Sequence, residues 1–73
     1  MKLTRQWKRT GYAVRYDGDD ARAQVARLAQ IDGDTAESVK ARLLEGEEIQ
    51  TRAAWYFVPG ATRHAHLHRE KQR

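Results

Sequence analysis

Two segments with helical spacing of apolar residues lie next to each other in the middle of the chain, separated by a single turn. In the first, small and large apolar residues recur at three- and four-residue intervals on one face: Ala21, Val25, Leu28 and Ala29. Asp19 or Asp20 suits the N-cap of a helix that runs to about Ile31, and Gly33 suits the residue that closes it. A pair of short amphipathic helices must cover another apolar surface, and this requirement restricts the fold more than any other feature.

The second helical segment follows at once and is predicted over residues 35–45. Asp34 and Glu37 have the spacing of a capping box, and Gly46 ends the pattern. One side of this helix is apolar and holds Ala36, Val39 and Leu43, with Leu44 flanking it.

Segments with strand-like alternation flank the helix pair. Before it, aromatic and aliphatic residues alternate with others at Tyr12, Val14 and Tyr16. After it, one strand is predicted to run up to Pro59-Gly60, with one face formed by Ile49, Thr51, Ala53, Trp55 and Phe57. Tyr56 and Val58 then lie on the opposite face. Residues 3–8 are a candidate for an extra N-terminal strand.

The order β–α–α–β, with or without the extra strand, predicts a small two-layer α+β domain in which two helices cover one face of an antiparallel sheet. Leucine, isoleucine, valine and phenylalanine together supply only 12 of the 73 residues, so the core must be small. We expect residues 1–10 to be a basic N-terminal arm or edge strand, residues 11–60 the folded core, and residues 61–73 a flexible basic tail. The predicted core is Val14, Val25, Leu28, Val39, Leu43, Trp55 and Phe57.

The formal net charge of +4 is unevenly distributed along the chain. Residues 1–10 hold four basic residues and no acidic one, and residues 61–73 hold four basic residues and one acidic one. Residues 11–60 hold six basic residues and nine acidic ones. The excess of positive charge therefore lies at the two ends, which are the places where an acidic partner is expected to bind.

Residues 25–44 resemble part of a helix-turn-helix motif, with Ala29 four positions before Gly33 and Val39 six positions after it. The resemblance implies that the second helix reads DNA. Asp32, Asp34 and Arg42 occupy places that are usually apolar in that family, and acidic residues open the second helix. The alternative is a plain helical hairpin that serves as half of a core.

His64, His66 and His68 alternate near the C-terminus, as three ligands of one metal ion would on a strand. Because Pro59-Gly60 precedes them and no other His or Cys cluster exists, we expect a tail without a specific metal. The acidic turns at residues 17–20 and 32–34 precede helices, which favours capping over calcium binding. We expect no cofactor.

Catalytic chemistry has little support in the sequence. Ser38 is the only serine and lies within a predicted helix, and the chain has no cysteine. The glycines are isolated, so no phosphate-binding loop is present. The longest apolar run, residues 53–58, is too short to span a bilayer, and a cytoplasmic, non-enzymatic protein is the expectation.

In size, composition and lack of catalytic motifs, the chain resembles small phage-encoded regulators that bind bacterial RNA polymerase and inhibit or redirect transcription. The resemblance implies a polymerase subunit as the partner. The expected partner-binding residues combine charges of the two ends with aromatic side chains: Lys2, Arg5, Trp7, Lys8, Arg9, Tyr12, Tyr16, Tyr56 and Arg63.

The alternative function is direct DNA or RNA binding, through the helix pair or the basic ends. Its expected contacts are the cations of the second helix and of the C-terminus: Lys40, Arg42, Arg69, Lys71 and Arg73. The sequence also leaves open a toxin–antitoxin component or another scaffold protein.

Overall fold

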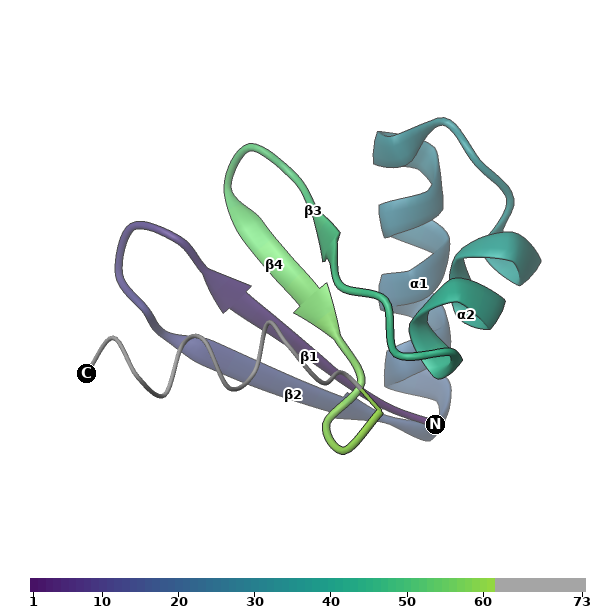
Figure 1. The fold of residues 1–73 in the computed structure, drawn as a ribbon, viewed down its shortest axis with the longest axis horizontal. Coiled ribbons are helices and arrows are strands. Elements are labelled where there is room, and N and C mark those ends of the chain that lie inside the picture. Colours follow the sequence, from purple (N-terminus) through teal and green to yellow (C-terminus); the bar gives the residue numbers. More distant parts are fainter. Residues whose placement is uncertain (62–73) are drawn as a thin grey trace.

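The structure, a computed structural model, describes residues 1–61. It contains a four-stranded antiparallel sheet and two helices (Figure 1), with the elements β1 (Lys2–Trp7), β2 (Ala13–Asp17), α1 (Gly18–Asp32), α2 (Ala36–Leu44), β3 (Ile49–Gln50) and β4 (Ala54–Phe57). The order of strands across the sheet is β2-β1-β4-β3. The predicted α+β fold is confirmed, including the extra N-terminal strand.

The first hairpin places β1 in the interior of the sheet, between β2 and β4. The basic N-terminal segment was expected to be an arm or an edge strand, and this expectation is wrong for residues 2–7. The Trp7 N–H donates to the Tyr12 carbonyl and the Gly11 N–H donates to the Trp7 carbonyl, each over 2.9 Å, which closes a four-residue turn. Leu3 then faces Tyr16 and Arg5 faces Val14 across the two strands.

The second hairpin corrects the prediction of one long strand from residue 49. A tight turn separates β3 from β4: the Thr51 N–H donates to the Ala54 carbonyl at 2.9 Å, and the Ala54 N–H donates to the Thr51 hydroxyl at 3.1 Å. The turn shifts the alternation by one residue, so that Ile49 pairs with Tyr56. Tyr56 therefore lies in the core, contrary to the prediction, because the strand reverses instead of continuing.

Each helix starts at a different cap from the predicted one. The Asp17 carboxylate accepts from the Gly18 N–H at 2.9 Å, because β2 leads into α1 without a linking loop, so neither Asp19 nor Asp20 is the N-cap. The N-cap of α2 is Thr35, whose hydroxyl accepts from the Ser38 N–H at 3.1 Å. The capping box predicted between residues 34 and 37 is therefore not the cap of α2.

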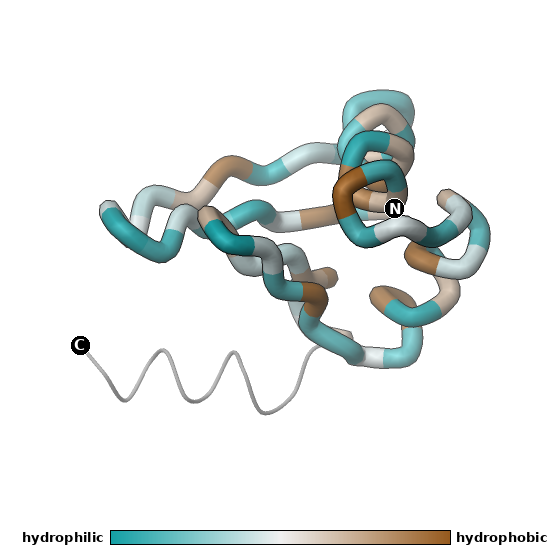
Figure 2. The backbone as a smooth tube through the Cα atoms, turned by 90° about the horizontal axis from the view of Figure 1, so that it is seen from above, coloured by the Kyte–Doolittle hydropathy of each residue, from teal (hydrophilic) through white to brown (hydrophobic). Residues whose placement is uncertain are grey.

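One core joins the helices to the sheet, and its members are Leu3, Ala21, Val25, Leu28, Ala29, Val39, Leu43, Ile49, Ala54, Tyr56 and Val58. Of the predicted core residues, Val14 and Trp55 are only half-buried, and Phe57 is buried outside this cluster. Figure 2 shows hydrophobic segments where the strands run beside the helices and mainly hydrophilic ones at the hairpin turns. No helix within residues 1–61 has the length and apolarity needed to cross a bilayer.

Candidate functional site

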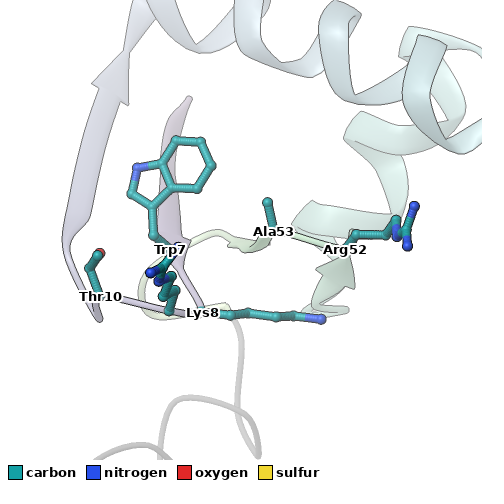
Figure 3. A pocket seen from close by; sticks show the side chains of 6 residues that line it. Trp7, Lys8, Thr10, Arg52 and Ala53 are labelled. Atoms are coloured by element: carbon teal, nitrogen blue, oxygen red, sulfur yellow. The ribbon is translucent and has the colours of Figure 1, made fainter.

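The two hairpin turns lie side by side at the end of the sheet that is farther from the helices (Figure 1). The Lys8 N–H donates to the Ala53 carbonyl at 2.9 Å and so fixes one turn against the other. Together they line an open hollow, shown in Figure 3, that we call the tip surface; it consists of Trp7, Lys8, Arg9, Thr10, Arg52 and Ala53. Backbone pairing therefore holds the two turns together at the tip surface.

Positive charge dominates the tip surface. Lys8, Arg9 and Arg52 are all exposed, and none of them forms an ion pair with another residue of the described part of the chain. Residues 1–16 and 49–61, which comprise the strands and their turns except for Asp17 at the end of β2, hold six basic residues and no acidic one. Residues 17–48, which form the helical layer, hold nine acidic residues and four basic ones. The fold therefore separates a basic sheet from an acidic helical layer.

Aromatic rings lie beside two cations of β1 and its turn, Lys8 and Arg5. The Lys8 ammonium lies 5.7 Å from the centre of the Trp55 ring. The Arg5 guanidinium stacks between two rings, 4.5 Å from Trp7 and 5.4 Å from Tyr16. Cation–aromatic contacts of this length are attractive, and they restrict the motion of the side chains that make them.

Some of the predicted partner-binding residues lie together at the tip surface, and others lie in the core or elsewhere on the sheet. Trp7, Lys8 and Arg9 come together at the tip surface, and Tyr12, which is 65 % exposed, follows the first turn. Tyr56 is only 5 % exposed and belongs to the core, so it offers no surface to a partner.

The remaining predicted residues are scattered. Lys2 is exposed near the opposite end of β1 from the tip surface. Arg5 and Tyr16 are half-buried, and the Arg5 guanidinium donates to the Gln24 side-chain carbonyl at 3.2 Å. Arg63 lies outside the described residues.

Sequence reasoning missed two residues of this region, Arg52 and Trp55. Both belonged to a predicted continuous strand, in which Arg52 had no assigned role and Trp55 was assigned to the core. In the structure Arg52 sits at the exposed turn, and Trp55 is half-buried under Lys8. The available signal was the single cation between Thr51 and two alanines, which is weak evidence for a turn.

The cations expected to bind nucleic acid from the second helix differ in their availability. Lys40 is exposed on α2. Arg42 lies in an ion-pair cluster, which we call the Arg42 cluster, with closest distances of 3.0, 3.3 and 2.8 Å to the carboxylates of Asp32, Asp34 and Glu47. Arg42 thus links the end of α1 to the two loops that flank α2. Arg69, Lys71 and Arg73 lie outside the described residues.

The Arg42 cluster shifts the protonation equilibria of its members. Hydrogen bonds to Glu47 and then to Asp32 raise the pKa of Arg42 above its ordinary value. The hydrogen bond from Arg42 is the main cause that lowers the pKa of Glu47. The pKa of Asp34 is also lowered, first by the Thr35 backbone N–H and next by the Ser38 hydroxyl. All three groups are therefore held in their charged forms.

No three potential metal ligands converge within residues 1–61. The alternating histidines at positions 64, 66 and 68 fall outside the described residues. The acidic turn residues that the structure describes serve the helices: Asp17 caps α1, and the Asp34 carboxylate accepts from the Thr35 N–H at 2.8 Å.

Comparison with models of known protein families, with curated proteins and with solved structures gives no match for this chain.

Proposed function

We propose that this chain is a small, non-enzymatic binding module that docks its tip surface onto an acidic surface of a protein partner. The observation that carries the proposal is the separation of charge between the two layers. Six cations and no carboxylate occupy residues 1–16 and 49–61, so the sheet has an excess of positive charge that its own residues do not neutralise. An acidic partner would be drawn to the sheet and repelled by the helical layer, which selects one orientation of approach.

The aromatic side chains beside the cations supply the second requirement of an interface. Trp7 is half-buried against the core, and Tyr12 is exposed next to it in the same hairpin. Tryptophan, tyrosine and arginine are the residues that most often carry the binding energy of protein interfaces. Because Trp7 is already held by Arg5 and by the core, little conformational freedom is lost when a partner covers it.

The proposed partner is the host transcription machinery, with a bacterial RNA polymerase subunit as the specific candidate. Support for this choice comes from the similarity in size and composition to phage-encoded regulators of that enzyme, and the basic tip surface fits a partner that presents carboxylates. Such a regulator acts in the cytoplasm and needs no cofactor.

The second candidate function is direct binding of DNA or RNA. What favours it is that three cations, Lys8, Arg9 and Arg52, line one hollow together with Trp7, and Lys8 also lies over the Trp55 ring, a combination found in surfaces that bind single strands. The binding would use the tip surface, because the helix pair commits Arg42 to carboxylates.

Binding kinetics of the full chain distinguish the two candidates. Purified bacterial RNA polymerase and a DNA oligomer, in single- and double-stranded form, are the two probes. With polymerase, Lys8→Glu and Arg52→Glu should each slow association by about tenfold at low salt, because the charge is reversed where the partner approaches. Arg27→Glu, an exposed site on α1, is the control and should leave association nearly unchanged. Binding to DNA alone, in proportion to tip charge, would reject the protein partner in favour of the second candidate.

A further inference from the structure

The outer side of β2 is an open edge of the sheet. The strand order places β2 at one end, and no strand within residues 1–61 pairs with its outer side. An open edge presents backbone N–H and C=O groups that can pair with a strand of another chain. The edge begins at Ala13, immediately after Tyr12 and the first turn, and is therefore continuous with the tip surface.

The register identifies the backbone groups that point outward. The Trp7 N–H donates to the Tyr12 carbonyl, so these two residues form a hydrogen-bonded pair. Hydrogen-bonded and non-hydrogen-bonded pairs alternate along antiparallel strands, so the next pair, Gln6 with Ala13, is not hydrogen-bonded, and the one after it, Arg5 with Val14, is. The N–H and C=O groups of Ala13 and Arg15 therefore point away from β1, toward the open edge.

The pairing of β1 with β4 supports this assignment. The Lys8 N–H donates to Ala53, on the β4 side of β1. Gln6 lies two residues before Lys8, so its backbone groups point to the same side of β1, where Gln6 pairs with Trp55 of β4. The backbone groups of Gln6 therefore point away from its partner on β2, Ala13, and Ala13 has no backbone hydrogen bond to β1.

The side chains along this edge indicate which kind of strand could pair with β2. Arg15 is exposed on the face opposite Val14, and Lys2 lies diagonally across from Arg15 on the same face of β1. The other face of β2 presents Val14 and Tyr16, which are half-buried. Asp17, at the end of the strand, is the one carboxylate on β2, and it is engaged as the cap of α1. A strand beside β2 would meet positive charge on one face and apolar side chains on the other.

We propose that the edge of β2 binds an extended acidic segment of the protein partner by strand addition, with carboxylates toward Arg15 and apolar side chains toward Val14 and Tyr16. This inference rests on the proposed function and names the chemistry of the partner. A peptide backbone satisfies both the N–H and the C=O groups of the edge. A phosphodiester backbone has acceptors only and leaves the outward carbonyls unpaired. The edge therefore selects protein over nucleic acid.

Amide hydrogen exchange of the isotopically labelled full chain tests the pairing. The probe is a peptide of about eight residues that alternates glutamate and valine, and a peptide of alternating lysine and valine is its control. The Glu–Val peptide should slow exchange at Ala13 and Arg15 by about tenfold or more at saturation. The amides of Val14 and Tyr16, already paired with β1, should change little. Binding without protection at Ala13 and Arg15, or failure to bind at millimolar concentration, would overturn the proposal.

Two substitutions test the edge itself. Ala13→Pro removes one outward N–H at the first position of a strand, where proline is tolerated, and should weaken binding of the Glu–Val peptide by about fivefold or more. Val14→Pro is the matched control and should instead unfold the hairpin, because its N–H points to β1. Arg15→Glu should reverse the preference, so that the Lys–Val peptide binds more tightly than the Glu–Val peptide. If Ala13→Pro fails to fold, the peptide preference of Arg15→Glu tests strand addition.

The outcomes separate this inference from the proposed function. If Lys8→Glu and Arg52→Glu weaken binding of the polymerase while Ala13→Pro and Arg15→Glu bind it like the wild type, the tip surface binds the partner and strand addition is wrong. If all four variants bind the polymerase like the wild type, the proposed function is wrong as well.

Discussion

The sheet and the helical layer of this protein differ in charge although they share one core. Residues 1–16 and 49–61, which form nearly all of the sheet and its turns, hold six basic residues and no acidic one, whereas residues 17–48 hold nine acidic residues against four basic ones. Cations within the sheet repel one another, and the acidic layer attracts them. The shared core therefore keeps the cations of the sheet close together although they repel one another. Stability should therefore depend on the contact between layers, and binding on the sheet.

The largest effect is expected where the two layers meet. Leu3 is fully buried on β1 in the shared core, and Leu3→Ala should lower the free energy of unfolding by about 2–5 kcal/mol. Trp55→Ala should cost less, about 1–2 kcal/mol, because Trp55 is half-buried outside that core. Urea denaturation of the two variants measures the difference. Equal losses would show that the sheet is stabilised as much by its outer side as by the helices.

A backbone change in the connection between the layers should have the next largest effect. Gly46 lies between α2 and β3 with φ of 98°, and a Cβ atom there would lie 2.5 Å from the Ala61 carbonyl oxygen. Gly46→Ala should therefore destabilise the fold by about 1–3 kcal/mol.

The matched control for this change is Gly11, at the first hairpin turn. It also has a positive φ, 71°, but a Cβ atom would meet nothing within 4 Å. Gly11→Ala should cost about 1 kcal/mol, from backbone strain alone. Thermal unfolding of both variants separates steric conflict from strain, and equal shifts of the melting temperature would contradict the close approach to Ala61.

The Arg42 cluster makes the helical layer sensitive to acid. The pKa values of Asp34 and Glu47 lie below their ordinary values of 3.8 and 4.5. Their contribution to stability is thus fully present above about pH 4.5 and is lost as the pH falls through the lowered values. Arg42→Met should reduce stability at neutral pH and flatten the loss in acid.

The flattening should be incomplete, because the Thr35 backbone N–H is the main cause of the shift at Asp34 and remains in the variant. Urea midpoints measured at neutral and acidic pH provide the test, with Arg22→Met, an exposed cation on α1, as the control. An acid sensitivity of Arg42→Met that equals that of the wild type would show that the cluster contributes no measurable stability.

The helices were the most predictable part of the fold because their information is local. Val25 and Leu28, and Val39 and Leu43, are spaced by three or four residues, and all four are buried as predicted. The caps were less predictable, since several acidic residues compete before each helix and backbone geometry decides among them. Asp17 caps α1 because β2 ends at this residue, and the end of a strand is not encoded by the residues next to it alone.

The turn between β3 and β4 was not predicted, because none of its residues is glycine, proline, asparagine or aspartate. The Thr51 hydroxyl closes it, and one extra reversal exchanges the faces assigned to Trp55 and Tyr56. The candidate site was only half predictable for a related reason. Lys8 and Arg52 are neighbours through the pairing of β1 with β4, which joins parts of the chain that are far apart in sequence.

The smallest effect on stability is expected from the charges themselves, and its sign distinguishes the two layers. Arg52→Gln removes a cation from the basic sheet and should raise the free energy of unfolding by a few tenths of a kcal/mol, roughly 0.3, at low salt. Arg27→Gln removes a cation from the acidic helical layer and should lower it by a similar amount, about 0.3 kcal/mol. Screening should bring both variants toward the wild type at high salt, because exposed charges interact through solvent. Urea denaturation at two salt concentrations measures both signs. If both substitutions shift stability in the same direction, the charges act only through their nearest contacts, and the separation of charge between the layers has no influence on folding.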